Sequence, residues 1–480
     1  MDAHKMWIGG QWMEAESGAT FPVYNPATGE ELARVPLGGE AEVNKAVAAA
    51  RRAFPVWSRK TQNERSKLLN QFAISIRQHA DEVAKLETTE HGTPVADAKH
   101  IIMWSAELAE YAASACRALM GQDIPALPNV VSYLHRVPVG VCALITPWNV
   151  PFLMMVVKMV SALGPGNTCV IKPPSINSLI GLKFAEIVAK LDLPPGTVNV
   201  ITGPGGSVGN ALASHPDVDL VGFTGSTATG RSIMSACSQT IKKLVAELGG
   251  KNPFIILEDA DIDKAVNLFV FRQCNNAGQH CSGVGRYYVH EKVHDAFVEK
   301  FVAASKKVIV GDPADPKTVM GPVVSAEHRN SIERYVKSGI EEGANLLLGG
   351  YRPVEPPLNK GFFVLPTVFT GVTQQMKIAR EEIFGPVACI MKFSDADDVV
   401  ALANDNDYGL CAGVFTRDVP KAFRMGNELN VGSFFINTHM LTPEMPWGGG
   451  VKQSGLGKEG SVVGLEEFTE LKLICLALDQ

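Results

Sequence analysis

The sequence lacks several features that mark specialised classes of protein. Its 9 cysteines are an odd number among 480 residues and include no Cys-x-x-Cys pair, which argues against a disulfide framework or a zinc site and favours reduced thiols in the cytoplasm. Lys and Arg number 44, are scattered, and are outnumbered by 50 Asp and Glu, so we expect no surface for nucleic acids or anionic membranes. The longest apolar stretch, residues 150–163, is too short to span a bilayer and contains Lys158. Residues 1–20 are polar and lack the apolar core of a signal peptide, so secretion is not expected.

The composition is that of an ordinary folded protein. Hydrophobic residues make up 46% and charged residues 20% of the chain, which excludes a disordered protein. A chain of this length exceeds what one hydrophobic core usually serves, so we expect two domains and a small third element.

The order of helical and strand-like segments predicts an α/β fold. Residues 40–117 are helical in pattern, and residues 130–137 alternate like a strand. Between residues 139 and 248, short β-branched runs alternate with helical windows, which is the pattern of a doubly wound, mostly parallel sheet. A second alternation covers residues 253–435, and the tail, 468–478, is again strand-like. We therefore predict two doubly wound, Rossmann-like α/β domains and a small β element drawn from distant parts of the chain.

The segment NNAGQHCSG, from Asn275 to Gly283, is the richest in reactive groups. It is polar, contains two glycines and holds Cys281 near its centre. A nucleophilic thiol needs exposure, small neighbours and backbone N–H groups that lower its pKa, and we expect this segment to provide all three. Most of the other cysteines are interpreted as structural, like Cys169 in an apolar run, because free cysteine is usually buried.

Glu247 and Asn149 are polar residues that follow apolar strand-like runs. Glu247 precedes two glycines that allow close backbone approach, and a carboxylate there could act as a general base. Asn149 lies between Pro147 and Pro151, where its amide could donate to a developing oxyanion. Taken alone, Glu247 is better explained as a surface residue before a turn, and Asn149 is a weak signal as well.

Two glycine-rich loops are candidates for binding phosphate. Residues 203–206 precede one predicted helix, and residues 223–230 place glycines and hydroxyls at the start of another, where backbone N–H groups attract anions. Neither loop is a G-x-G-x-x-G motif, so the ordinary dinucleotide fingerprint is absent. Considered separately, each loop is more often a simple turn.

The combination of these segments resembles the aldehyde dehydrogenase superfamily along nearly the whole chain. Seven segments match that family in its order: ITPWNVP (145–151), VIKPPS (170–175), FTGSTATG (223–230), ELGGKNP (247–253), NAGQHCSG (276–283), EEIFGPV (381–387) and PWGGGVKQSGLGKEG (446–460).

The resemblance implies roles for the three candidate catalytic residues. Cys281 aligns with the family's nucleophile, Glu247 with its general base, and Asn149 with the oxyanion-hole amide, which works beside the backbone N–H of Cys281. The implied reaction is oxidation of an aldehyde to a carboxylic acid through a thiohemiacetal and a thioester on Cys281. The family's CoA-acylating branch typically lacks the carboxylate base, so hydrolysis is expected here. Lys158 and Glu459 align with residues proposed to carry protons away from Glu247 in some members.

The resemblance also implies NAD or NADP as the cofactor and no metal. Strongly NAD-selective members often have Glu three residues after Lys172, where it repels a 2′-phosphate; this chain has Ser175, so we expect NADP to be accepted. The implied cofactor-binding residues are Ile145, Thr146, Pro147, Trp148, Lys172, Ser175, Gly205, Phe223, Thr224, Gly225, Ser226, Leu248, Gly249, Glu382 and Phe384.

The residues expected at the substrate pocket describe an apolar tunnel with aromatic rings. A medium aliphatic or aromatic aldehyde is therefore the first expectation, and no pair of arginines for a carboxylate is apparent. Trp447 resembles the betaine aldehyde and aminoaldehyde branch, where aromatics surround a cation, so an aminoaldehyde, betaine aldehyde or semialdehyde is the alternative. The expected pocket residues are Trp104, Val150, Met154, Val157, His280, Ser282, Leu441 and Trp447.

The resemblance also divides the chain into functional parts. Members assemble as dimers or tetramers, so we expect a homo-oligomer. A non-catalytic relative with a structural or binding role is a further alternative, although Cys281 and Glu247 are both present. The expected parts are residues 1–120 and 138–247 for the dinucleotide-binding domain, 248–445 for the catalytic domain, 121–137 and 465–480 for oligomerisation strands, and 446–464 for a C-terminal segment lining the pocket.

Overall fold

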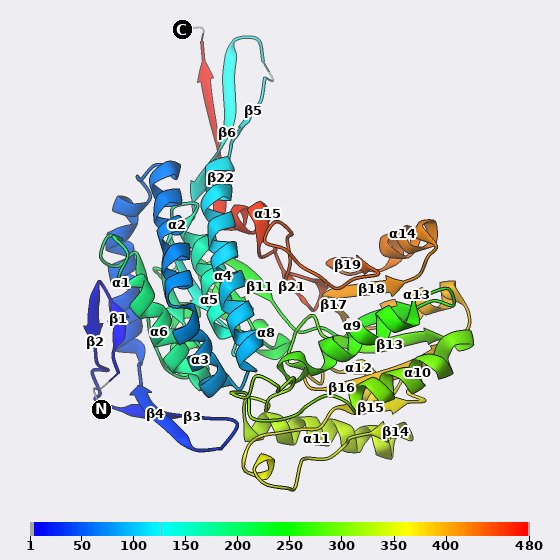
Figure 1. The fold of residues 1–480 in the computed structure, drawn as a ribbon. Helices are drawn as coiled ribbons and strands as arrows, with labels where there is room; N and C mark the ends of the chain where they lie inside the picture. The colour runs from blue at the N-terminus through cyan, green and yellow to red at the C-terminus, as the bar shows by residue number, and fades with distance from the viewer. Residues whose placement is uncertain (1–3, 126, 479–480) are drawn as a thin grey trace.

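The structure is a computed structural model that describes residues 4–125 and 127–478. The parts of the predicted segments at residues 1–3, 126 and 479–480 lie outside the described residues. Two α/β bodies lie side by side, and a long strand arm that ends near the C-terminus projects from one of them (Figure 1). None of the described helices is long and apolar enough to cross a membrane.

The first body is built on an eight-stranded sheet in the order β2-β1-β9-β8-β7-β10-β11-β21. Its five central strands are parallel and follow the 3-2-1-4-5 order of a doubly wound fold. A hairpin of β1 and β2 adds to one edge and β21 to the other, in antiparallel pairing. The strands are β1 (Met6–Ile8), β2 (Gln11–Met13), β7 (Val141–Ile145), β8 (Thr168–Lys172), β9 (Val198–Val200), β10 (Leu220–Thr224), β11 (Lys243–Glu247) and β21 (Gly455–Leu456).

Helices cover both faces of this sheet, which explains why its strands read as unbroken apolar runs. All five residues of β7 are buried: Cys142 and Leu144 join one core, whereas Val141, Ala143 and Ile145 join the core on the opposite face. The helices are α1 (Glu40–Trp57), α2 (Gln62–Gln78), α3 (Ala80–His91), α4 (Val95–Ala115), α5 (Pro151–Leu163), α6 (Ser178–Val188), α7 (Asn210–Ser214) and α8 (Thr227–Ser238).

The second body is built on a seven-stranded sheet in the order β14-β15-β16-β13-β12-β18-β19, with one core of its own. All its strands are parallel except the edge strand β14. The strands are β12 (Asn252–Ile256), β13 (Val284–His290), β14 (Asn345–Leu348), β15 (Thr367–Thr370), β16 (Val387–Phe393), β18 (Cys411–Phe415) and β19 (Ser433–Ile436). Its helices are α9 (Ile262–Cys274), α10 (Glu291–Ser305), α11 (Ala326–Glu341), α12 (Lys377–Arg380), α13 (Ala396–Asn404) and α14 (Val419–Glu428).

The arm is a three-stranded sheet of segments that are far apart in the chain (Figure 1). Strand β22 (Thr469–Ala477) pairs antiparallel with β6 (Val130–Pro138) over the full length of both, and β5 (Gln122–Asp123) pairs with β6. The predicted pair of doubly wound sheets and the small β element are therefore confirmed. The remaining elements are β3 (Thr20–Tyr24), β4 (Glu31–Pro36), β17 (Tyr408–Gly409), β20 (Val451–Lys452) and α15 (Ser461–Glu466).

Candidate active site

One cavity of about 520 Å³ brings together the three predicted catalytic residues. Asn149 comes from the turn between β7 and α5, Glu247 is the last residue of β11, and Cys281 lies in the loop between α9 and β13. The three therefore come from the two bodies, and Glu247 and Asn149 lie at the carboxyl ends of parallel strands, where α/β sheets bind ligands.

An unusual backbone conformation presents Cys281. After α9 ends, Asn276, Ala277 and Gly278 all have positive φ angles, of 50°, 52° and 72°. Non-glycine residues rarely adopt this conformation, so surrounding contacts must hold it. The Asn276 side chain donates to the backbone oxygen of Asn149 at 2.7 Å, and the Gln279 side chain accepts from Val324 N at 2.9 Å. The first bond ties the loop to the first body, and the second ties it to the segment that precedes α11 in the second body.

The Cys281 thiol is half-buried, and its pKa differs from the sequence expectation. Burial raises this pKa well above the usual value for a thiol, and the carboxylates of Glu247 and Glu382 raise it further. The expectation that backbone N–H groups lower the pKa of this thiol is therefore wrong, because desolvation and negative charge outweigh them. The thiol also hydrogen-bonds Glu247, which places a proton acceptor beside it.

Glu247 is buried, with 2% of its surface exposed, and one carboxyl oxygen has no hydrogen-bond partner. Burial raises its pKa to about 8, and the neighbouring carboxyl of Glu459 adds to this rise. Glu459 itself forms a buried ion pair with Lys158 from α5. The interpretation of Glu247 as a surface residue before a turn is therefore excluded, and the carboxyl can exchange a proton near neutral pH.

The side-chain amide of Asn149 is held in place by the loop that carries Cys281. Its nitrogen donates to the backbone oxygen of Gln279 at 2.9 Å, and the residue is 6% exposed. An amide nitrogen carries two hydrogens, so one remains for a group in the cavity.

Most of the residues expected to bind the cofactor lie where the parallel strands of the first sheet end. Ile145, Lys172, Thr224 and Glu247 are the last residues of β7, β8, β10 and β11. Phe223, the residue before Thr224, lies inside β10 and is buried. The segments that follow the strands contain the other expected residues of this body, namely Thr146, Pro147, Trp148, Ser175, Gly205, Gly225, Ser226, Leu248 and Gly249. Pro147 and Thr224 also line the cavity that contains Cys281.

Lys172 and Ser175 form a polar corner beyond β8. Lys172 is 3% exposed, and its ammonium donates to the Pro173 oxygen at 2.9 Å. Burial lowers its pKa to about 8. The Ser175 hydroxyl donates to the Gly203 oxygen at 2.9 Å, which ties this turn to the glycine loop after β9 (Val198–Val200). Side chains added at Gly205 or Gly206 would meet open space.

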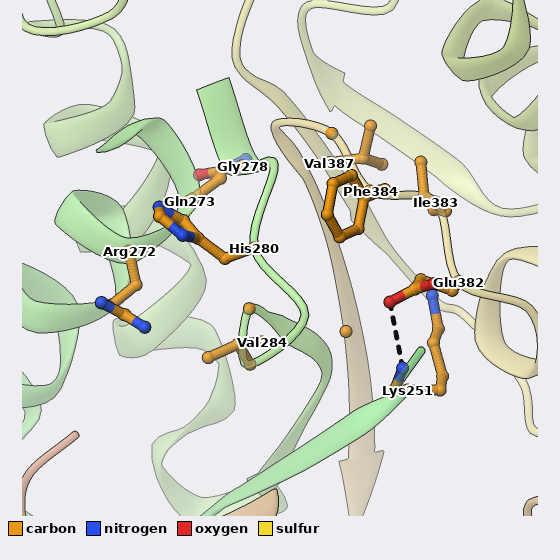
Figure 2. Close-up of a pocket in the computed structure, with 14 residues that line it drawn as sticks. Lys251, Arg272, Gln273, Gly278, His280, Val284, Glu382, Ile383, Phe384 and Val387 are labelled. Atoms are coloured by element: carbon orange, nitrogen blue, oxygen red, sulfur yellow. Dashed lines mark hydrogen bonds between the residues drawn. The ribbon is translucent and has the colours of Figure 1, made fainter. Parts of the chain in front are cut away.

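Glu382 and Phe384 reach the first body from the turn before β16. Glu382 accepts from Gly250 N at 3.0 Å, and a Cβ on Gly249 would lie 2.5 Å from the carboxylate. Phe384 has a φ of 57° and contacts the Trp148 ring at 5.2 Å between centroids. Figure 2 shows Glu382 and Phe384 across a small pocket from His280 and Arg272.

The cavity lining agrees with most of the expected substrate pocket. Trp104 and Trp447 stack with their centroids 6.4 Å apart. Val157 does not line the cavity; it packs behind the lining in a cluster with Val150 and both tryptophans. The expected residues that do line it are Trp104, Val150, Met154, His280, Ser282, Leu441 and Trp447.

Sequence reasoning missed several polar lining residues. Arg272 and Asn275 come from the end of α9 and its following turn, and His439 comes from the loop after β19. A cation in the otherwise apolar end of the helix before the Cys281 loop was a signal for Arg272; for His439 the sequence offers no comparable signal. Asp97, His100 and Glu107 also line the cavity. No cluster that could hold a metal ion occurs among the described residues.

Comparisons with known proteins identify the family of this chain. Residues 12–474 match the model of the aldehyde dehydrogenase family. The chain is 41% identical over 471 residues to betaine aldehyde dehydrogenase of Bacillus subtilis (strain 168), covering 97% of this chain and 96% of that protein. It is 40% identical to mitochondrial 10-formyltetrahydrofolate dehydrogenase of Mus musculus over 98% of this chain, but spans only 52% of that relative's length. Betaine aldehyde dehydrogenase from Staphylococcus aureus in complex with NAD+ has a TM-score of 0.97 at 36% identity, with 100% of this chain and 96% of that chain covered. The chain therefore belongs to the aldehyde dehydrogenase family.

Proposed function

We propose that this enzyme oxidises an aldehyde to its carboxylic acid, with Cys281 as nucleophile, Glu247 as general base and Asn149 as oxyanion donor. The observation that carries the proposal is the meeting of these three groups, from three separate segments, in one cavity of about 520 Å³. As a member of its family, the chain is an NAD(P)-dependent aldehyde oxidoreductase.

The chemistry of Cys281 begins with loss of its proton. The thiol has a raised pKa and hydrogen-bonds Glu247, whose own pKa is about 8, so the carboxylate is matched to accept that proton when substrate enters. The sulfur then adds to the aldehyde carbon, and the carbonyl oxygen becomes an alkoxide. The free N–H of the Asn149 amide and the backbone N–H of Cys281 would stabilise this charge.

The residues around the strand ends fit an extended dinucleotide. Gly205 and Gly206 leave open space where side chains would stand, Gly249 admits the Glu382 carboxylate, and Ser226 caps the N-terminus of α8. Lys172 and Trp148 would hold the adenosine half, and Glu382 and Phe384 the nicotinamide half. Bound NAD or NADP would accept the hydride that leaves the substrate carbon, which leaves a thioester on Cys281.

Release of the acid requires water and a base. Glu247 is buried and has one oxygen without a partner, so it can bind and deprotonate a water molecule that attacks the thioester. A CoA-acylating enzyme would have no need of this carboxylate. The buried pair of Lys158 and Glu459, next to Glu247, offers a place for the proton.

NADP is proposed to be accepted beside NAD because Ser175 is small and uncharged. Its hydroxyl bonds Gly203, and the buried Lys172 lies three residues before it, so a positive charge rather than a carboxylate stands near this turn. A 2′-phosphate would then meet no repulsion.

The apolar part of the cavity supports an aliphatic or aromatic aldehyde of medium size. Trp104, Trp447, Leu153 and Met154 supply apolar walls. The stacked tryptophans and the similarity to betaine aldehyde dehydrogenase favour a cationic aldehyde as the second candidate.

The proposal is tested by following absorbance at 340 nm with a panel of aldehydes, each with NAD and with NADP, in the absence of CoA. We expect Cys281→Ala to abolish turnover, whereas the exposed Cys475→Ala retains it. Undiminished turnover by Cys281→Ala would refute the assignment. A wild-type enzyme that is silent with every aldehyde would revive the non-catalytic alternative, and a requirement for CoA would indicate the acylating reaction.

A further inference from the structure

Arg272 is the single Lys or Arg among the described residues that line the cavity containing Cys281. Its Nη2 donates to the Ser282 hydroxyl at 3.0 Å, and its Nε is buried without any acceptor. The ionisable groups that act on it are the thiols of Cys411 and Cys281 and the phenol of Tyr287; within the described ranges it forms no ion pair with a carboxylate. The residue is partly exposed, but its guanidinium has five N–H donors and, in the part of the chain that the structure describes, only the bond to Ser282 is formed, so it is free to bind an anion in the cavity.

His439 presents two more unpartnered polar atoms in the same cavity. The residue is 6% exposed, and neither of its ring nitrogens has a hydrogen-bond partner. Its ring is held between Phe254 and Phe435, each with centroids 4.8 Å away. A buried polar ring without partners is unfavourable unless a ligand supplies one, so His439 and Arg272 point to the same missing group.

The charges around these two residues favour an anion. Burial and the charge of Arg272 lower the pKa values of His439 and His280, so both imidazoles are neutral at neutral pH and Arg272 carries the positive charge. Among the lining carboxyls, Asp97 already accepts a bond from Asn275, and Glu107 is exposed. Glu247 is not among the groups that act on Arg272. No lining carboxylate neutralises the guanidinium.

We propose that the cavity selects aldehydes that carry a carboxylate, which Arg272 binds with help from a neutral N–H of His439. Guanidinium and carboxylate match in planar, two-point hydrogen bonding. The body of the substrate would remain aliphatic or aromatic, against the tryptophan side of the cavity. This inference rests on the proposed function and names the substrate class of that site.

Two other roles for Arg272 make different predictions. A cationic aldehyde would be repelled by Arg272, so its selection would require the tryptophans to outweigh that charge. If Arg272 instead stabilised the Cys281 thiolate, every aldehyde would depend on it equally.

The first experiment compares pairs of substrates that differ only in the carboxylate: 4-oxobutanoate with butanal, 6-oxohexanoate with hexanal, and 4-formylbenzoate with 4-methylbenzaldehyde. We expect wild-type kcat/KM to be higher for the acid in at least one pair. Arg272→Met should lower kcat/KM for that acid on the order of 100-fold, mainly through KM, because a buried charge pair loses one partner. The uncharged aldehyde should change less than about threefold, and Arg272→Lys should recover part of the loss because it restores the charge without the planar fork.

A second experiment needs neither turnover nor cofactor. Iodoacetate and iodoacetamide are similar in size and alkylate the same thiol, but only iodoacetate is an anion. We expect the rate with iodoacetate divided by the rate with iodoacetamide to be higher at Cys281 than for glutathione. In Arg272→Met this ratio should fall to the glutathione value, and in His439→Phe it should fall part of the way. Mass spectrometry identifies the alkylated residue, and free glutathione serves as the exposed reference thiol. If the protein oxidises no aldehyde in any assay but Cys281 still reacts preferentially with iodoacetate, the proposed function fails while the anion site stands.

Three results would overturn the inference. One is preference for the uncharged aldehyde in all three pairs; another is preference for betaine aldehyde or 4-aminobutanal over the acids. The third is an Arg272→Met variant that loses activity equally with acids and uncharged aldehydes, with an unchanged alkylation ratio.

Discussion

Glu247 is the residue whose environment most alters its chemistry. Its pKa is raised to about 8 by burial and by Glu459, and a carboxyl must lose its proton before it can act as a base. The rate of thioester hydrolysis is therefore expected to increase as pH rises through about 8, whereas a carboxyl with an ordinary pKa would already be ionised at pH 6.

Glu247→Gln should separate the two halves of the reaction. The variant keeps the shape of the side chain but has no base, so we expect acylation of Cys281 to be slower yet still to yield one equivalent of NADH per active site, followed by steady turnover reduced at least about 100-fold. Stopped-flow absorbance measures this first equivalent of NADH, and mass spectrometry should find the acyl group on Cys281. Full turnover by this variant would exclude Glu247 as the hydrolytic base.

Ser175 is expected to decide how well NADP competes with NAD. Ser175→Glu places a carboxylate beside the turn that Ser175 now ties to Gly203. We expect the KM for NADP to rise much more than the KM for NAD, because the new charge repels the 2′-phosphate. Ser175→Gln, which has the same size without the charge, is the control. Equal increases in the KM values for NADP and NAD would show that charge repulsion of the 2′-phosphate is not the cause.

At the scale of elements, the start of α8 (Thr227–Ser238) is expected to affect both the stability of the fold and the binding of the cofactor. The Ser226 hydroxyl accepts from Thr229 N at 3.2 Å and so caps this helix. Ser226→Ala should lower the free energy of unfolding by about 1 kcal/mol and weaken NADH binding. Urea unfolding and NADH fluorescence measure the two effects.

Ser226→Asp tells these two effects apart. Asp caps a helix as well as Ser does, so this variant should regain stability, yet its charge should repel the cofactor pyrophosphate and leave binding weak. Wild-type affinity in Ser226→Asp would show that this helix end does not face the pyrophosphate.

The loop that carries Cys281 illustrates what element-level reasoning could predict. The order of helix, polar loop and strand was predictable, since α9 and β13 have clear apolar patterns. The raised pKa of the thiol was not, because it depends on the Glu247 and Glu382 carboxylates, which lie 34 residues before and 101 residues after Cys281 in the chain.

At the scale of the whole molecule, the arm of β6 and β22 exposes apolar side chains that no other part of the described chain covers. Leu471, Leu473 and Leu476 are each more than half exposed on β22, in a sheet that extends away from the main body (Figure 1). Exposed apolar strands of this kind are typical of protein–protein contacts. The homo-oligomer predicted from the sequence would cover them.

Leu473→Asp should therefore weaken self-association. We expect light scattering coupled to size exclusion to detect a smaller species than for wild type, because the new charge would have to be buried in the contact. Val354→Asp changes an apolar residue that is even more exposed than Leu473 and lies in a loop away from the arm, so it should leave the mass unchanged. A monomeric wild type, or an unaltered mass for Leu473→Asp, would refute the predicted oligomerisation strands.

The sequence by itself determined the fold class and the family, and it predicted Cys281, Glu247 and Asn149 as the catalytic residues. It could do so because apolar periodicity and glycine positions are local, and because seven motifs occur in order. Tertiary structure alone decided the ionisation of Cys281 and Glu247, the position of Val157 behind the cavity lining, and the convergence of Arg272 and His439 in its wall. Burial and charge pairing depend on which distant segments meet, so only the packed chain could determine them.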